Sequence, residues 1–277
     1  MYPTTSAVGK TVRMNRIFRE DGRALMVAIN HGLGMGPIQG IADMGGLFDK
    51  ICSERVDSLT LHKGIAMRHM DKFAGSIALI LKGTNITQFY SPEEMAVASV
   101  DEAVALGADA VALGLSLCSG LEKDVVTGIA KTIELANRAG MPVVTHSYPN
   151  GDLIAREERY SVKQVGYATR MALELGVDII KTFWTGDGKS FEEIVKIGAP
   201  AKVVISGGPR CDTLRECFEM TWQGIHAGAA GVTYGRNIWQ HEYPAAVVRG
   251  LAAIIHDNAS VDQAMEISCE CAGVKLS

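Results

Sequence analysis

The chain has 277 residues, of which 47% are hydrophobic and 21% charged, as in a folded globular protein; a wholly disordered, collagen-like or coiled-coil chain is excluded. The formal net charge of −4 argues against a protein that binds nucleic acid through a broad basic surface. No stretch reaches the roughly 18 apolar residues of a membrane span, and the start of the chain lacks a signal peptide's apolar core. We therefore expect a cytoplasmic protein without membrane or nucleic-acid partners.

Short apolar runs rich in β-branched residues recur along the chain and predict strands. The predicted strands are Leu25–Asn30, Ser58–His62, Ile77–Lys82, Ala108–Leu115, Pro142–Tyr148, Asp178–Trp184, Lys202–Gly208 and Gly231–Arg236. Apolar residues at helical spacing predict helices between several of them, namely Pro92–Leu106, Leu121–Ala139, Ser161–Leu175 and Asp212–Ala227. The pattern is therefore strand, then helix, repeated.

Repeated units of this kind, about 35 residues each, match an α/β fold of the (β/α)8 TIM-barrel type. The first twenty or so residues predict a short N-terminal helix that closes the bottom of the barrel. A doubly wound open sheet is the alternative, because periodicity does not distinguish an open sheet from a closed one. No linker or low-complexity tract divides the sequence, so we expect a single barrel domain over residues 1–277.

A barrel enzyme carries its active site at the carboxyl ends of its strands. Polar residues gather at these ends in the predicted barrel: Asn30-His31-Gly32, His62-Lys63-Gly64, Lys82-Gly83, His146-Ser147-Tyr148, Lys181-Thr182, Ser206-Gly207-Gly208 and Gly235-Arg236. These segments hold our candidate site residues.

Lys181 stands inside the apolar run VDIIKTFW rather than beside it. Lysine is seldom buried without a reason, and on a strand this side chain shares a face with Ile179 and Phe183, which can direct it into the barrel mouth. Burial can lower the pKa of an amine from about 10.4 toward 7. A neutral amine can attack a ketone and form a Schiff base, an electron sink for carbon–carbon bond cleavage or formation. The alternative is a lysine that reaches solvent or pairs with Asp178 or Asp187.

Tyr148 ends another predicted strand, and His146 lies two residues earlier on the same face. A phenol and a neutral imidazole could each move a proton to or from a substrate hydroxyl or a carbinolamine. The alternative is a tyrosine at the rim and a histidine at the edge of the core, both without a catalytic role.

The glycine-rich segments ISGGPR and YGRNIW end the seventh and eighth predicted strands. Barrels often bind phosphate in the loops after these strands, where glycine lets the backbone approach the anion. Arg236 would add a bidentate positive group. Together the two segments favour a small phosphorylated substrate.

Seven segments carry a resemblance to a known family. They are GKTVRMNRIF, NHGLGMGP, LHKGI, SYPNGD, DIIKTFWTGD, ISGGPR and GVTYGRNIWQHE. In this order the chain resembles the archaeal-type class I fructose-bisphosphate aldolase family from about residue 9 to residue 270. Its N-terminal and LHKGI segments are similar to the 2-amino-3,7-dideoxy-D-threo-hept-6-ulosonate synthase branch, and IIHDNASVDQAMEI is similar to the phosphorylated-dione thiolase branch.

The resemblance implies a TIM barrel, a Schiff-base lysine at Lys181 and an acid/base tyrosine at Tyr148. It implies phosphate binding by Ser206, Gly207, Gly208, Gly235 and Arg236. It implies no metal and no cofactor, and it carries the expectation of a homo-oligomer.

Asn30 departs from the resembled family, which has Asp-His-Gly where this chain has Asn30-His31-Gly32. An amide cannot take a proton at neutral pH, whereas a carboxylate can. The acid/base steps would then fall on Tyr148, His146, His31 or a water molecule. His146 is a second departure, since the sugar-bisphosphate aldolases tend to carry a bulky aromatic residue there.

Three functions are consistent with these observations. The first is a class I aldolase or transaldolase that makes or breaks a carbon–carbon bond in a phosphorylated ketose. The second is a thiolase on a phosphorylated dione, which would require coenzyme A for turnover. The third is a non-catalytic sugar-phosphate-binding barrel, which would bind its ligand without forming an imine.

Overall fold

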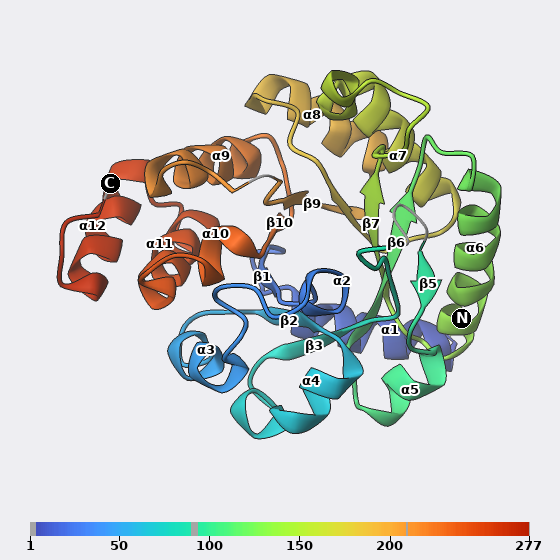
Figure 1. Ribbon diagram of the computed structural model, residues 1–277, viewed down its shortest axis with the longest axis horizontal. Coiled ribbons are helices and arrows are strands. Elements are labelled where there is room, and N and C mark those ends of the chain that lie inside the picture. The colour runs from blue at the N-terminus through green and yellow to red at the C-terminus, as the bar shows by residue number, and fades with distance from the viewer. Residues whose placement is uncertain (1–3, 90–93, 209, 277) are drawn as a thin grey trace.

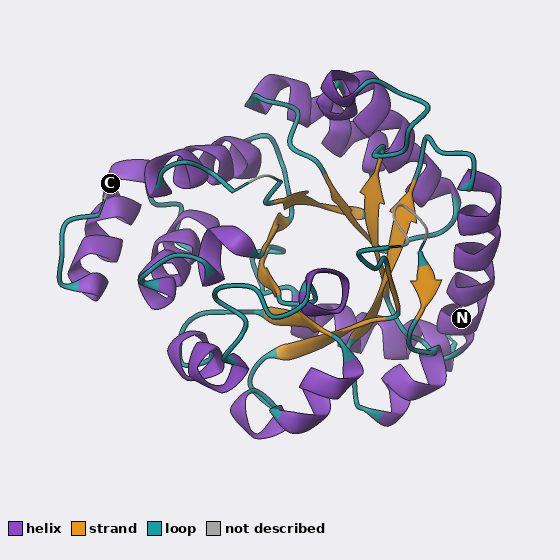
Figure 2. Ribbon diagram, in the orientation of Figure 1, coloured by secondary structure: helices purple, strands orange, loops and turns teal. Residues whose placement is uncertain are grey.

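A closed barrel of parallel strands forms the centre of the protein, with helices around it (Figures 1 and 2). The computed structural model describes residues 4–89, 94–208 and 210–276. The barrel strands are β1 (Ala24–Ala28), β2 (Ser58–Leu61), β3 (Ala78–Lys82), β6 (Ala110–Ser116), β7 (Val143–Tyr148), β8 (Ile179–Thr182), β9 (Lys202–Ser206) and β10 (Gly231–Tyr234). Their spatial order, β1-β10-β9-β8-β7-β6-β3-β2, closes on itself because β1 pairs with both β10 and β2. The predicted TIM barrel is confirmed, and the open-sheet alternative is wrong.

Helices cover the outside of the barrel and extend its C-terminal side. They are α1 (Thr5–Ile17), α2 (Gly32–Met35), α3 (Met44–Ile51), α4 (Lys63–Arg68), α5 (Val100–Ala105), α6 (Glu122–Arg138), α7 (Val162–Glu174), α8 (Gly188–Gly198), α9 (Leu214–His226), α10 (Arg236–Trp239), α11 (Pro244–His256) and α12 (Val261–Ala272). Short 3-10 helices span Met70–Lys72 and Arg156–Tyr160. Within the described residues, no helix has the length and apolar character needed to cross a membrane.

The predicted helix Pro92–Leu106 is wrong in its first part. Met95–Ala96 form the short strand β5, which pairs antiparallel with β4 (Thr84–Asn85). The helix α5 begins only after Ser99, whose side chain caps it in a reciprocal pair of hydrogen bonds with Glu102. Pro92 lies outside the described residues.

The helix α1 closes the bottom of the barrel, as predicted. Its last residue Ile17 and the following Phe18 are buried, and Met14 packs beside them. These side chains contact the interior apolar layer that includes Met26 and Ile80. The barrel is therefore filled with side chains at this end.

The side chains that face the barrel interior are apolar at the bottom of the barrel and mostly polar at its mouth. The interior layer includes Ile80, Ala112, Val144, Ile179 and Val204. Two residues further along the same strands lie Lys82, Gly114, His146, Lys181 and Ser206. Because side chains two apart on a strand point to the same face, these positions face the mouth of the barrel.

Candidate active site

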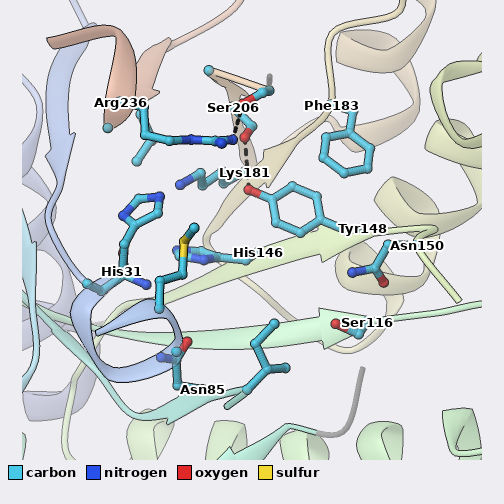
Figure 3. Close-up of a pocket in the computed structure, with 18 of the residues that line it drawn as sticks. His31, Asn85, Ser116, His146, Tyr148, Asn150, Lys181, Phe183, Ser206 and Arg236 are labelled. Atoms are coloured by element: carbon cyan, nitrogen blue, oxygen red, sulfur yellow. Dashed lines mark hydrogen bonds between the residues drawn. The ribbon is translucent and has the colours of Figure 1, made fainter. Parts of the chain in front are cut away.

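A cavity of about 620 Å³ opens at the carboxyl ends of the strands (Figure 3). Every candidate site residue predicted from the sequence lines it: Asn30, His31, His146, Tyr148, Lys181, Ser206, Gly207, Gly208, Gly235 and Arg236. The strands predicted from the sequence pattern had placed these residues at the carboxyl end of the barrel. Closure of the barrel brings them together around one cavity.

Lys181 is buried in this cavity, with 5% of its surface exposed. Burial lowers the pKa of its amine to about 7, and the nearby Lys82 adds to this effect. The two carboxylates that could have neutralised it are occupied elsewhere: Asp178 pairs with Lys10 at 2.9 Å, and Asp187 accepts a hydrogen bond at the start of α8. Within the described part of the chain Lys181 has no ion-pair partner, so a large fraction of its amine is neutral at pH 7.

Several side chains that line the cavity have a buried polar atom without a hydrogen-bond partner among the residues that the structure describes, three of them among the predicted site residues. In these three, the unpaired atoms are Oδ1 of Asn30, Nδ1 of His31 and Nε2 of His146. Burial lowers the pKa of His31 to about 4 and that of His146 well below its usual value, and Lys181 contributes to both shifts. The two imidazoles are therefore neutral at pH 7. Unsatisfied buried polar atoms are costly, so this end of the cavity is suited to a polar ligand.

The Tyr148 hydroxyl is directed toward Ser206, which belongs to one of the two glycine-rich segments (Figure 3). It donates a hydrogen bond to Oγ of Ser206 at 2.9 Å, and the Tyr148 ring stacks on Phe183 at 4.3 Å between centroids. Burial raises the pKa of its phenol well above the usual value. The group is therefore protonated at neutral pH, and it is a weaker acid than a free phenol.

The two glycine-rich segments meet at one side of the cavity. The Arg236 guanidinium donates to the carbonyl oxygen of Gly208 at 3.1 Å. Asn237 ties the loops together, since its amide donates to the carbonyl of Gly207 at 3.3 Å. Gly235 is required by close approach, because a Cβ atom there would lie 2.7 Å from the His31 ring. A positive group and exposed backbone thus converge at one place.

The sequence analysis missed a buried ion pair in the same cavity. Lys82 is 2% exposed, and its Nζ lies 3.8 Å from Oε2 of Glu94. The run IALILK placed Lys82 at a strand end, but Glu94 stood in a segment predicted to be a helix. By contrast, Lys63 also follows a strand, and it pairs with Glu102 outside the cavity.

Comparison with known proteins finds a family and close relatives. The family described as DeoC/LacD family aldolase matches residues 24–241. A 2-amino-3,7-dideoxy-D-threo-hept-6-ulosonate synthase of Halobacterium salinarum is 31% identical over 258 residues, which cover 93% of this chain and 95% of that protein. A class 1 fructose-bisphosphate aldolase of the same species is 34% identical, over 88% of this chain and 95% of its own.

Solved structures agree with the sequence relatives. An archaeal fructose 1,6-bisphosphate aldolase superimposes with a TM-score of 0.83 at 32% identity, covering 90% of this chain and 99% of that one. Another archaeal fructose-1,6-bisphosphate aldolase has its catalytic lysine covalently bound to the carbinolamine intermediate of the substrate. It superimposes with a TM-score of 0.82 at 32% identity, over 89% of this chain and 99% of its own.

Proposed function

This chain belongs to the DeoC/LacD family of aldolases, and we propose that Lys181 is the residue on which its chemistry takes place. The protein is a class I, Schiff-base-forming enzyme that makes or breaks a carbon–carbon bond in a sugar phosphate. The observation that carries the assignment is the buried amine of Lys181, which has a pKa of about 7 and lies at the mouth of a barrel of the aldolase family.

In the proposed mechanism, the neutral Nζ of Lys181 attacks the ketone carbon of the substrate and forms a carbinolamine. Loss of water gives an iminium ion. The hydroxyl on the carbon two positions beyond the imine carbon then passes its proton to a water molecule or to a neutral imidazole of the cavity. As it does so, the bond between the first and second carbons beyond the imine breaks, its electron pair flows into the iminium to form an enamine, and the leaving fragment departs as an aldehyde. In the synthetic direction the same steps run in reverse.

Tyr148 is proposed to supply a proton to the carbinolamine oxygen as it leaves as water. Its hydroxyl lies in the same cavity as Lys181 and is protonated at neutral pH. Asn30, His31 and His146 are proposed to bind the substrate hydroxyls through their unpaired atoms. Neutral groups at these positions can form hydrogen bonds with the substrate hydroxyls, and they place no additional charge beside the iminium ion.

The substrate phosphate is proposed to lie against Arg236 and the loop Ser206 to Gly208, with Gly235 beside it. The guanidinium provides a charge-assisted contact, and the glycines leave room for the anion to reach the backbone. A cytoplasmic location, one barrel domain over residues 1–277 and assembly into a homo-oligomer remain predictions that rest on the sequence and on the resemblance.

The test is covalent capture with sodium borohydride. Incubation with dihydroxyacetone phosphate and borohydride is expected to add the mass of the reduced adduct once per chain, on the peptide that contains Lys181. Lys181→Met should abolish the adduct, and Lys196→Met on the exposed face of α8 should retain it. An adduct on Lys63 or Lys82 with Lys181 unmodified would overturn the assignment. Binding of dihydroxyacetone phosphate without any adduct would favour the non-catalytic barrel.

A further inference from the structure

We propose that Glu94 restricts this site to ketose substrates that carry a single phosphate, by pairing with Lys82 at the end of the cavity opposite Arg236. The inference rests on the proposed function, because it takes the loops of Arg236 and Gly208 as the phosphate site. It concerns the other end of the same substrate.

Glu94 is held in the cavity by the short hairpin of β4 and β5. It immediately precedes β5, and its Oε2 accepts a hydrogen bond from Oγ1 of Thr84 on β4 at 2.8 Å. The same hydroxyl accepts from the Gly114 backbone N–H at 2.7 Å, which fixes the direction of its own proton toward Glu94. Only 11% of the Glu94 side chain is exposed. The carboxylate is therefore fixed in place by its neighbours.

Gly114 provides the space for this carboxylate. A Cβ atom at this position would lie 1.8 Å from Oε1 of Glu94, and the clash would extend to the whole carboxylate group. Gly114 is also the register partner of His146, which in turn pairs with Lys181. Glu94 thus lies over the strand next to the reactive residues, within the space that the substrate would share.

The charged side chains are distributed unevenly between the two sides of the cavity. Arg236 and Arg210 both lie on the side of β9 and β10. On the side of β3 and β6, Nζ of Lys82 lies 3.8 Å from Oε2 of Glu94. Burial lowers the pKa of Lys82, and the Glu94 carboxylate opposes this shift by stabilising the ammonium form. Among the described residues that line the cavity, Glu94 is the one carboxylate. A second phosphate at this end would meet a fixed negative charge and a cation that already has a partner.

The remaining groups at this end suit hydroxyls rather than an anion. Figure 3 shows Asn85 and Ser116 at the end of the cavity away from Arg236, with Asn150 beyond the Tyr148 ring. Oδ1 of Asn150 is buried and has no hydrogen-bond partner among the described residues. Neutral donors and acceptors of this kind bind a polyol chain. The geometry therefore fits a substrate with a phosphate at one end and hydroxyls at the other.

The experiment compares two ligands that cannot form an imine, a hexitol 1-phosphate and the corresponding hexitol 1,6-bisphosphate, in which an alcohol replaces the ketone. Their dissociation constants are measured by calorimetry on the full chain. We expect the parent protein to bind the monophosphate at least about tenfold more tightly. Glu94→Gln should reduce this preference about tenfold, mainly by tightening the bisphosphate, because it removes the carboxylate that repels the second phosphate and lets that phosphate take its place beside Lys82.

Two control variants separate charge from structure. Glu94→Asp keeps the negative charge and should keep the preference for the monophosphate. Glu193→Gln removes the same charge from the exposed face of α8 and should leave both dissociation constants unchanged. Thermal unfolding of each variant confirms that it folds.

Equal affinity of the parent for the two ligands, or an unchanged preference in Glu94→Gln, would overturn the proposal. So would an equal loss of preference in Glu94→Asp and Glu94→Gln, because the position rather than the charge would then matter. These outcomes are independent of imine chemistry. Failure of borohydride capture on Lys181, with the ligand preference intact, would refute the proposed catalytic role and leave the charge argument standing.

Discussion

His146 on β7 is the direct register partner of Lys181 on β8, and both side chains are buried at the mouth of the barrel. Two titratable groups so close in a dry site cannot easily both carry a positive charge. The pKa of His146 is held well below its usual value, first by burial and then by Lys181. The imidazole therefore stays neutral, and the amine beside it loses its proton near pH 7. A nucleophilic amine is thus available without a carboxylate beside it.

The first prediction concerns the pH dependence of Schiff-base formation. Because attack requires the neutral amine and the pKa of Lys181 is about 7, the rate of borohydride capture should rise with pH, reach half its maximum near pH 7 and then level off. An ordinary lysine would show a rate that keeps rising to about pH 10. The measurement is the rate of adduct formation by intact mass, at a constant concentration of dihydroxyacetone phosphate. A profile that still climbs steeply above pH 9 would contradict the lowered pKa.

The second prediction separates proton transfer from imine formation. Tyr148→Phe removes the hydroxyl that donates to Ser206 and keeps the ring that stacks on Phe183. We expect kcat to fall by about 10²- to 10⁴-fold, the usual size of a general acid/base contribution, while Lys181 still captures ketone.

The matched control for this variant is Tyr160→Phe. Tyr160 also packs against Phe183 and lines the cavity, and its ring centroid lies 4.9 Å from that of Phe183. This variant should retain kcat within a few-fold. Full turnover by Tyr148→Phe would show that the phenol carries no proton in the rate-limiting step.

The barrel and much of the site could be predicted from the sequence because a strand has a period of two. An apolar residue in the interior layer, such as Ile179, fixes the direction of the residue two positions on, here Lys181. The same argument leads from Val144 to His146. Once the strands are assigned, closure of the barrel brings their ends together regardless of the details of the loops.

Glu94 could not be predicted in this way. Its segment has apolar residues at helical spacing, and local sequence does not reveal that Met95–Ala96 will pair with Thr84–Asn85. The Thr84 side chain in this pair also accepts a hydrogen bond from the backbone of Gly114, a contact between distant parts of the chain. The signal that could have found the site is Lys82, a lysine at the end of an apolar run that requires a buried partner.

The third prediction tests the phosphate site. A charge-assisted contact to an anion is worth on the order of 2 kcal/mol, so Arg236→Ala should weaken the binding of dihydroxyacetone phosphate by tens-fold. Arg215→Ala, which removes an exposed arginine paired with Asp262, is the control and should leave binding unchanged. Calorimetry measures both. Equal affinity of Arg236→Ala and the parent would place the phosphate elsewhere.

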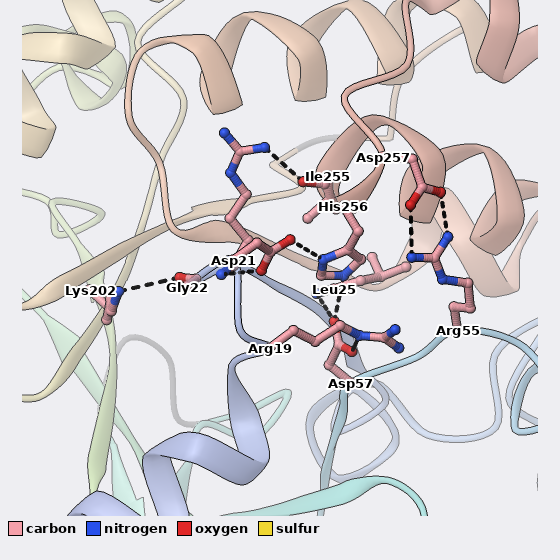
Figure 4. Close-up of polar contacts among 11 residues, drawn as sticks. Arg19, Asp21, Gly22, Leu25, Arg55, Asp57, Lys202, Ile255, His256 and Asp257 are labelled. Atoms are coloured by element: carbon pink, nitrogen blue, oxygen red, sulfur yellow. Dashed lines mark hydrogen bonds and ion pairs between the residues drawn. The ribbon is translucent and has the colours of Figure 1, made fainter.

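The bottom of the barrel is held by a polar network around Asp57 (Figure 4). Oδ2 of Asp57 accepts hydrogen bonds from the Leu25 backbone N–H at 2.6 Å and from Nε2 of His256 at 2.9 Å. Its other oxygen pairs with Arg19. His256, at the end of α11, also contacts Asp21 through Nδ1 at 2.7 Å. The network thus joins α11 to the beginnings of β1 and β2.

The fourth prediction is that Asp57→Asn destabilises the fold and leaves the site intact. The variant leaves the buried His256 and the Leu25 N–H with a weaker, uncharged acceptor, which should cost about 2 kcal/mol. Urea unfolding measures the loss, and borohydride capture at low temperature should be unchanged because the network lies at the opposite end of the barrel. Asp262→Asn, which breaks an exposed pair, should cost much less. An equal cost in the two variants would show that the network contributes little.

The fifth prediction concerns Asn30, the amide that stands where the resembled family carries an aspartate. Asn30 is buried, lines the same cavity as Lys181, and its Oδ1 has no partner among the described residues. In Asn30→Asp a carboxylate would stabilise the ammonium form of Lys181 and raise the pKa of the amine. A higher pKa means that the neutral amine is reached only at higher pH, so the midpoint of borohydride capture should move upward by about one unit.

The consequence for activity follows from the sign of that shift. At pH 7 the Asn30→Asp variant should capture dihydroxyacetone phosphate several-fold more slowly than the parent, and at about pH 9 the two rates should converge. Asn30→Ala removes the amide without adding a charge, and its midpoint should stay near pH 7. If kcat of Asn30→Asp on ketose phosphates at high pH exceeds that of the parent, the amide limits ordinary aldol cleavage; if it falls, the amide is matched to the natural substrate. An unchanged midpoint in Asn30→Asp would contradict this prediction and show that a charge at residue 30 does not reach the Lys181 amine.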